Sequence, residues 1–268
     1  MMRSLEHFCL EVSADIRVLL FDIDDTLTTD GMLTAEAYAA VARAKLSGLI
    51  VIPITGRPAG WCDHIARMWP VDGVIGENGA FYFRYHRAGR QYVRRFMASE
   101  EVRLHNRQQL NAAAAQVLAN VPGAALASDN PYREADVAID FCEDVPRLPP
   151  AAVSRIRSLM EAAGLTARAS GSHVNGWIGD FNKLSTAKLM LREVFEFDAD
   201  ADKAKIVFVG DAPNDEPMFA FFPFSIGVAN VRDFADQLQS PPAYVADSRF
   251  GAGFIEVVDA VLAARAPH

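Results

Sequence analysis

Four short, mostly apolar runs constrain the fold of this chain more than any other feature of its sequence. The runs span residues 16–21 (IRVLLF), 49–54 (LIVIPI), 205–209 (KIVFV) and 224–228 (FSIGV). Apolar runs of this length, rich in branched side chains, are typical of strands buried on both faces of a parallel sheet. Helical patterns occupy residues 33–46, 58–68 and 183–195. We therefore predict an α/β fold whose core is a doubly wound, Rossmann-like parallel sheet.

The middle of the chain has a different pattern. Residues 81–96 (FYFRYHRAGRQYVRRF) alternate aromatic and basic side chains around Ala88-Gly89, which is typical of a hairpin with one solvated face. Further along, helical patterns near 100–119 and 150–163 are interspersed with strand-like runs at 135–141, 165–169 and 173–178. This mixture predicts an α+β unit. We expect residues 1–83 and 181–268 to form the core, interrupted by an inserted α+β domain of residues 84–180.

Composition excludes several classes of protein. The chain has 34 acidic and 26 basic residues, a formal net charge of −8, so a general nucleic-acid binder is disfavoured. The basic hairpin is more simply a solvated sheet face. Three cysteines without a CxxC motif indicate neither a disulfide framework nor a zinc site, and favour the cytoplasm. The apolar runs are far shorter than the ~18 residues that a membrane span needs, and the oligomeric state is not predicted.

Two acidic clusters directly follow predicted strands. Asp22, Asp24 and Asp25 come after the first, and Asp211 and Asp215 after the strand at 205–209. Ligands of open parallel sheets bind at the carboxyl ends of strands, so both clusters are expected at one edge. Two carboxylates ~4 Å apart repel by ~4 kcal/mol at an effective dielectric constant of ~20, which favours protonation or a bound cation. Oxygen ligands without nearby His or Cys point to Mg²⁺, although each cluster alone could simply cap helices and turns.

Two further segments suit a phosphate group. Thr55-Gly56-Arg57 follows the second strand, and Pro58 opens a helix, so a hydroxyl, a flexible backbone N–H and a helix N-terminus coincide. Lys183 stands just before another helix. A lone lysine is usually solvated surface, but a site with acids and phosphate needs a fixed cation.

In this order, the segments DIDDT (22–26), TGR (55–57), NK (182–183) and GDAPND (210–215) resemble the haloacid dehalogenase superfamily of aspartate-nucleophile phosphatases. The segment ENGA (77–80) is similar to the Cof-like (type IIB) branch, which carries a large αβ cap between the second and third motifs. The resemblance covers essentially the whole chain. It implies that the predicted insertion is this cap.

The resemblance also implies a role for each matching residue. Asp22 would be the nucleophile that forms an aspartyl-phosphate, and Asp24 the general acid and then the general base. Thr55 and Lys183 would hold the phosphate, assisted by Gly56 and Asn214.

For the metal, the resemblance implies that Mg²⁺ is bound by Asp22, the backbone carbonyl of Asp24, and Asp211. Asp215 would lie close by. Phosphoryl transfer depends mainly on positioning and charge neutralisation, which Mg²⁺ and Lys183 would supply.

In such an arrangement the cap would cover the site and select the leaving group. His173, Asn175 and Trp177 alternate as in a strand, just before the chain returns to the core. If they face the site, they could recognise a sugar or another polyol, although Trp177 could equally belong to the cap core. Arg133 and Glu134 are weaker candidates in a predicted loop.

The sequence thus predicts an Mg²⁺-dependent phosphomonoester hydrolase acting on a small phosphorylated metabolite, most plausibly a sugar phosphate. A phosphomutase would use the same aspartyl-phosphate and return the phosphoryl group to the substrate. A receiver-like signalling module also combines an acidic pair with Mg²⁺, Thr and Lys, but the insertion and Asp24 argue against it. A non-catalytic binding protein has no support, because every catalytic position is filled.

Overall fold

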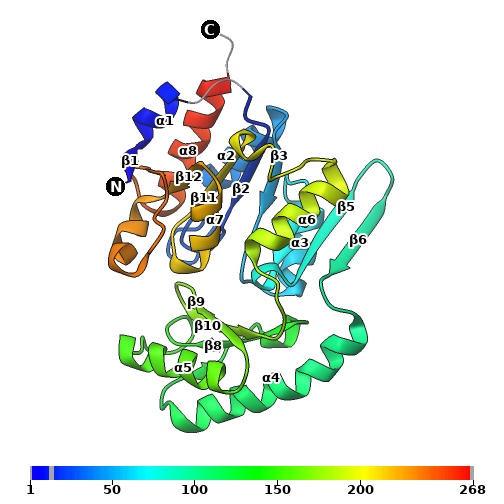
Figure 1. Cartoon of the computed structure of the whole chain (residues 1–268), viewed down its shortest axis with the longest axis vertical. Coiled ribbons are helices and arrows are strands. Elements are labelled where there is room, and N and C mark those ends of the chain that lie inside the picture. The colour runs from blue at the N-terminus through cyan, green and yellow to red at the C-terminus, as the bar shows by residue number, and fades with distance from the viewer. Residues whose placement is uncertain (1, 12–14, 266–268) are drawn as a thin grey trace.

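The computed structural model describes residues 2–11 and 15–265. Its core is a six-stranded sheet in which every neighbouring pair is parallel (Figure 1). In spatial order the strands are β1 (Arg3–Ser4), β13 (Tyr244–Val245), β12 (Phe224–Gly227), β11 (Ile206–Gly210), β2 (Val18–Phe21) and β3 (Ile50–Pro53). The two strands that precede the acidic clusters, β2 and β11, are direct neighbours. The predicted doubly wound α/β core is confirmed.

Helices cover both faces of this sheet, which explains why its strands are apolar throughout. Alternate residues of β2 face opposite ways: Leu19 and Phe21 pack in one apolar cluster, and Val18 and Leu20 in the other. The first cluster contains residues of α1 (Leu5–Glu11), α2 (Ala35–Leu46) and α8 (Phe250–Arg265). The second contains residues of α6 (Lys183–Phe195) and α7 (Glu216–Phe221).

The aromatic and basic hairpin of residues 81–96 belongs to a small sheet on the core side of the molecule. Strands β5 (Phe81–His86) and β6 (Gln91–Phe96) pair antiparallel with each other, and β5 pairs with β4 (Val74–Gly76). A single bridge between Ile54 and Ile75 links β4 to the end of β3. Helix α3 (Ala59–Met68) packs on this small sheet. The hairpin therefore belongs to a different sheet from the strands that follow it.

A separate four-stranded antiparallel sheet faces the core (Figure 1, in green, below the core in this view). Its order is β7 (Ala125–Leu126), β8 (Asp136–Asp140), β10 (His173–Trp177) and β9 (Thr166–Ala169). Helices α4 (Glu100–Asn120) and α5 (Pro150–Ala162) cover its outer face. We call this unit the cap. Short 3₁₀ segments complete the described fold: η1 (Glu77–Gly79), η2 (Asn130–Tyr132), η3 (Lys203–Lys205), η4 (Pro213–Asp215) and η5 (Ala229–Gln237).

The cap sheet has two distinct faces. Val174 packs in the apolar cluster with α4 and α5, and Gly176 lies against Leu165 and Met160. Because side chains alternate along a strand, His173, Asn175 and Trp177 share the opposite face, toward the core. The alternation predicted for these three residues is thus present. Among residues 2–11 and 15–265, the helices are too short or too polar to span a bilayer.

Candidate active site

Asp22, Lys183 and Asp215 meet at the carboxyl ends of β2 and β11. Asp22 directly follows β2, and its amide donates to Val209 O on β11. Lys183 Nζ lies 2.5 Å from Asp22 Oδ1 and 2.8 Å from Asp215 Oδ1. All three side chains are buried. The predicted convergence of the two acidic clusters and the lysine is present in the structure.

The position of Lys183 depends on the start of helix α6. Asn182 and Ser185 form a reciprocal capping box, and Thr186 Oγ1 donates to Gly79 O at 2.6 Å. A Cβ on Gly79 would lie 2.3 Å from Asn182 O, and Gly79 has a φ of +108°. Only glycine permits this close approach without strain. Segment 77–79 thus fixes the first turn of α6, and with it the lysine.

Asp211 completes a group of three buried carboxylates. Oxygen atoms of Asp22, Asp211 and Asp215 lie within 4.8 Å of one another. Thr26 Oγ1 donates to Asp211 Oδ1 at 3.0 Å, and Asn230 Nδ2 donates to Asp211 Oδ2 at 2.9 Å. Each Asp211 oxygen therefore has a hydrogen-bond donor that fixes its orientation.

The electrostatics of this group favour a bound cation. Burial raises the pKa of Asp22 well above its ordinary value; Lys183 opposes the shift, while Asp215 and Asp24 add to it. Burial, Asp22 and Asp215 likewise raise the pKa of Asp211. Burial alone would lower the pKa of Lys183, but Asp215 and Asp22 raise it, so the lysine stays charged. One lysine cannot balance the charge of three ionised carboxylates. A divalent cation would neutralise the negative charge that remains on the group.

The side chain of Asp24 lies outside this carboxylate group. Thr55 Oγ1 donates to Asp24 Oδ2 at 3.3 Å, and Arg57 Nε donates to Asp24 Oδ1 at 2.8 Å. The Asp24 side chain is 26% exposed, whereas the other carboxylates are buried. Two aspartates two positions apart therefore occupy different environments, as separate nucleophile and acid–base roles would require.

Two of the four predicted phosphate-binding residues line a cavity with the aspartates, while Thr55 and Lys183 contact Asp24 and Asp22 directly. Gly56 and Asn214 line a small cavity together with Asp22 and Asp24. Asn214 Oδ1 is buried and has no hydrogen-bond partner among the described residues. A Cβ on Gly56 would lie 3.2 Å from Asn78 Nδ2 and 3.6 Å from Asn175 Oδ1. The Gly56 backbone thus lies beneath a cap residue.

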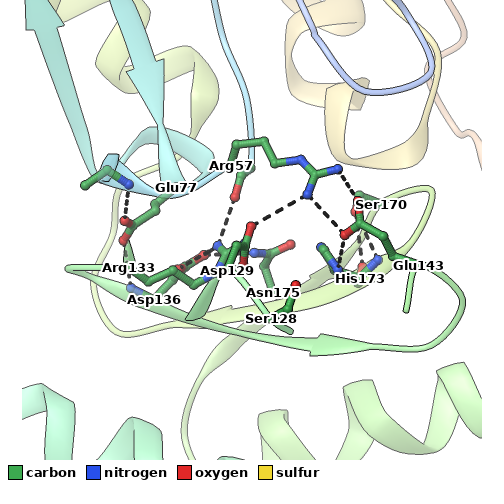
Figure 2. Close-up of polar contacts among 12 residues, drawn as sticks. Arg57, Glu77, Ser128, Asp129, Arg133, Asp136, Glu143, Ser170, His173 and Asn175 are labelled. Carbon is green, nitrogen blue, oxygen red and sulfur yellow. Dashed lines mark hydrogen bonds and ion pairs between the residues drawn. The ribbon is translucent and has the colours of Figure 1, made fainter. Parts of the chain in front are cut away.

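Arg57, which the sequence analysis treated only as part of the TGR segment, connects the core to the cap (Figure 2). Its guanidinium donates to Glu143 Oε1 at 2.7 Å and Oε2 at 3.1 Å, besides Asp24. His173 Nε2 lies 2.8 Å from the same Glu143 carboxylate. The hydrogen bond with His173 and the charge of Arg57 hold the pKa of Glu143 well below its ordinary value. A sequence cannot reveal such a contact, because Glu143 has no motif around it.

A second link between core and cap is centred on Glu77 (Figure 2). Its carboxylate accepts hydrogen bonds from the backbone N–H groups of Glu134, Ala135 and Asp136 in the cap and of Ala59 in the core. Burial and the charge of Asp136 raise the pKa of Glu77 to about 8, although Arg133 and the N–H groups oppose the shift.

Arg133, a weak candidate from sequence, is buried next to this link. It pairs with Asp129 and Asp136, and its Nη1 donates to Gly56 O at 3.0 Å. Asn175 Nδ2 donates to Asp136 at 2.9 Å. This network joins the cap sheet to the TGR loop.

The cap residues predicted to recognise substrate separate into two groups. His173 and Asn175 line the cavity of about 20 Å³ that Asp22 and Asp24 also line. Trp177 lines a different cavity of about 230 Å³, stacks on Phe181 with ring centroids 6.0 Å apart, and donates to Phe181 O. The cap also approaches closely at Gly171, where a Cβ would lie 2.1 Å from Asp25 Oδ2. The cap is therefore closed over the carboxylate group.

Comparisons with known proteins agree with this geometry. The family model of haloacid dehalogenase-like hydrolases matches residues 16–222. A phosphoglycolate phosphatase from Methanothrix thermoacetophila is 26% identical over 249 residues, which is 93% of this chain and 98% of that protein.

Solved structures share the whole architecture. A Thermoplasma acidophilum protein matches with a TM-score of 0.69 and 21% identity, over 92% of this chain and 99% of that one. A HAD/COF-like hydrolase from Plasmodium vivax matches with a TM-score of 0.67 and 18% identity, over 97% and 99%. Sucrose-phosphatase from Synechocystis, solved with sucrose and phosphate, matches with a TM-score of 0.61 and 14% identity, over 92% and 98%. At these identities the structures establish the fold, and the family match establishes that this chain belongs to the haloacid dehalogenase-like hydrolases, as a phosphatase.

Proposed function

We propose that this phosphatase is an Mg²⁺-dependent phosphomonoester hydrolase that works through an aspartyl-phosphate on Asp22. The observation that carries the proposal is the contact of Lys183 with Asp22 and Asp215, next to Asp211. A nucleophilic carboxylate can approach an anionic phosphate only where fixed positive charge compensates for their repulsion.

The carboxylate group fits Mg²⁺. All three side chains offer oxygen, the ligand type that this ion prefers. Burial first, and then the neighbouring carboxylates, raise the pKa values of Asp22 and Asp211, so a bound cation would stabilise their ionised forms. Asp22, Asp211 and the backbone carbonyl of Asp24 would hold the ion, with Asp215 beside it. When bound, Mg²⁺ would neutralise charge on the phosphoryl oxygens and on Asp22.

In the first step, a carboxylate oxygen of Asp22 attacks phosphorus and the bond from phosphorus to the leaving oxygen breaks. Asp24 donates a proton to that oxygen. Because Arg57 Nε donates to Asp24 Oδ1, the proton belongs on Oδ2, the oxygen that Thr55 also contacts. Thr55, the Gly56 backbone, Asn214 and Lys183 would orient the phosphoryl oxygens.

In the second step, Asp24 is a carboxylate and accepts a proton from water. The water oxygen attacks phosphorus, the bond between phosphorus and Asp22 breaks, and inorganic phosphate leaves. Lys183 stabilises the carboxylate of Asp22 as it re-forms. Acid–base and nucleophilic roles thus fall on two aspartates held by different partners.

For the substrate, we propose a small phosphorylated metabolite whose leaving group lies under the cap, near His173 and Asn175. The sequence favours a sugar phosphate, and the curated relative acts on phosphoglycolate. We further propose a reducing, cytoplasmic setting, since Cys62 and Cys142 are free thiols. We keep the division into a core (1–83 and 181–268) and a cap (84–180) as a proposal; the pairing of β5 with β4 suggests that the specificity-determining part begins after the hairpin.

The test is a screen of phosphorylated metabolites with Mg²⁺, measured as released phosphate, for the wild type and Asp22→Asn. We expect EDTA and the substitution each to abolish turnover. Acid-quenched wild-type enzyme should carry one phosphoryl group on the peptide that contains residue 22. Activity that persists in Asp22→Asn would overturn the assignment of the nucleophile.

The same assay separates the alternatives. A phosphomutase would need a bisphosphate activator and would release little phosphate from a sugar monophosphate. A receiver-like module would hold its phosphoryl group and would not turn over p-nitrophenyl phosphate rapidly.

A further inference from the structure

Arg168 on strand β9 lies on the face of the cap that is turned toward the core. It is paired with Asn175 across the antiparallel ladder, so the two side chains share a face. Asn175 lies over the phosphate-binding loop, with its Oδ1 3.6 Å from the position of a Cβ on Gly56. Arg168 is therefore next to a residue that covers the phosphate site.

The cavity beside Arg168 also borders residues of the proposed active site. It measures about 230 Å³, and its lining includes Lys183 and Asn214 of the core together with Thr166, Arg168 and Trp177 of the cap. Asn214 also lines the small cavity of Asp22 and Asp24, so this residue borders both cavities. A phosphate held between Lys183 and Asn214 would thus lie at the border of the cavity that Arg168 lines.

Arg168 has no acidic partner among the described residues. Within residues 2–11 and 15–265, its one hydrogen bond is from Nη1 to Ala167 O, and it forms no ion pair with an acidic side chain. Two arginines that contact the core side of the cap are, by contrast, neutralised: Arg57 by Asp24 and Glu143, and Arg133 by Asp129 and Asp136. Asp180 is the one acidic side chain that lines the 230 Å³ cavity, and it is exposed.

On the far side of the site, Arg147 lines a cleft of about 480 Å³. Acidic side chains predominate there, since the cleft is also lined by Asp24, Asp25, Asp30, Glu143, Asp211 and Asp233. A free carboxylate would be repelled from that cleft and attracted to the side of Arg168.

We propose that Arg168 is a specificity-determining residue that pairs with a carboxylate on the leaving group, so that the enzyme prefers short phosphorylated carboxylic acids. The proposal rests on the proposed phosphatase function. The planar guanidinium offers two parallel N–H groups to a carboxylate, a geometry that a hydroxyl cannot match. An uncharged leaving group of the same length would leave the guanidinium to solvent.

The test compares matched substrates: 2-phosphoglycolate with 2-hydroxyethyl phosphate, and 3-phosphoglycerate with glycerol 3-phosphate. We expect the wild type to prefer the acid of each pair. Arg168→Gln should lower kcat/KM for the acids by ~10- to ~100-fold, mainly through KM, because a charge-assisted pair is lost. The uncharged esters should change less than ~2-fold, and Arg168→Lys should restore part of the preference.

Two variants serve as controls. Arg155→Gln removes an exposed arginine from α5, on the outer side of the cap, and should leave both substrates unchanged. Arg147→Gln tests the opposite cleft. The proposal is wrong if Arg147→Gln abolishes the acid preference, if Arg168→Gln affects both members of a pair equally, or if the wild type cleaves p-nitrophenyl phosphate but does not prefer the acids. If p-nitrophenyl phosphate and all four esters resist hydrolysis with Mg²⁺, the proposed phosphatase function itself fails.

Discussion

The ammonium nitrogen of Lys183 lies 2.5 Å from Oδ1 of Asp22, although 161 positions separate the two residues in the chain. The aspartate follows the second strand of the core, and the lysine begins a helix that comes after the entire cap. In the sequence, the cap therefore lies between two residues that are in contact in the fold. The site forms only when the core segments before and after the cap come together.

Lys183→Met should nearly abolish activity. We expect kcat/KM to fall by at least ~10²-fold, because a preorganised charge beside the proposed nucleophile is lost. The variant should also be less stable than wild type without Mg²⁺, since three buried carboxylates lose their counter-ion, and Mg²⁺ should restore more stability to it than to wild type. Thermal unfolding with and without Mg²⁺ measures this. Lys188→Met removes a partly exposed lysine paired with Asp200 and provides the control; equal Mg²⁺ effects in both variants would contradict the prediction.

Mg²⁺ should stabilise the wild type in proportion to its affinity. At a concentration ~100 times the Kd, the expected gain is ~2.7 kcal/mol, seen as a higher unfolding midpoint that EDTA reverses. Asp211→Asn should remove most of this gain, because it takes one carboxylate from the group. Asp233→Asn, on an exposed ion pair with Arg249, should keep the full gain. If the unfolding midpoint of the wild type does not change when Mg²⁺ is added, the metal assignment is refuted.

Asn230→Ala should weaken metal binding, although Asn230 is not itself a proposed metal ligand. Asn230 Nδ2 donates to Asp211 Oδ2 and to Asp25 O, both at 2.9 Å, so it fixes a proposed ligand. Loss of such a supporting hydrogen bond typically costs ~10- to ~100-fold in metal affinity. Calorimetric titration with Mg²⁺ measures the change. Thr26→Val removes the donor to the other oxygen of Asp211 and should act in the same direction.

Glu77→Gln should destabilise the protein by ~2–4 kcal/mol, because an amide nitrogen would face backbone N–H groups that now donate to a carboxylate oxygen. Urea unfolding measures the loss. Glu101→Gln, exposed on α4, should change little. Similar midpoints for the two variants would show that Glu77 does not hold the cap.

The link between Arg57 and Glu143 should weaken in acid. The pKa of Glu143 is lower in the folded protein than in the unfolded chain, where it is near 4.5. The unfolded chain therefore binds the proton first, so the stabilisation is complete above pH ~5.5 and declines as the pH falls below ~4.5. The unfolding free energy of wild type minus that of Glu143→Gln should follow this course. The difference should be at most ~1 kcal/mol, since the Glu143 side chain is 32% exposed. A constant difference down to pH 3 would contradict it.

Local patterns predicted the parts of the fold and site that local chemistry determines. Apolar runs located β2, β3, β11 and β12, and their order placed Asp22 and Asp211 at one edge. The last helix, α8, begins at Phe250, where Asn230 Oδ1, from a distant loop, accepts a hydrogen bond from the Phe250 amide. That contact has no signature in the sequence.

Contacts between core and cap were also beyond sequence patterns. Glu143, which accepts a hydrogen bond from Arg57, lies in a loop without a motif. Trp177 shares the predicted face with His173, but the stacking of its ring on Phe181 draws it away from the small cavity. The alternation along the strand predicted the face of the sheet on which each side chain lies. Packing between the core and the cap determined which residues each side chain contacts.

The contact at Gly171 has a consequence for the position of Asp25. With a Cβ only 2.1 Å from Asp25 Oδ2, a methyl group at this position would require the Asp25 carboxylate to turn aside. The lack of a side chain at residue 171 thus lets the cap approach the loop after β2 while Asp25 keeps its present position, and Gly171→Ala would displace the end of the Asp25 side chain first.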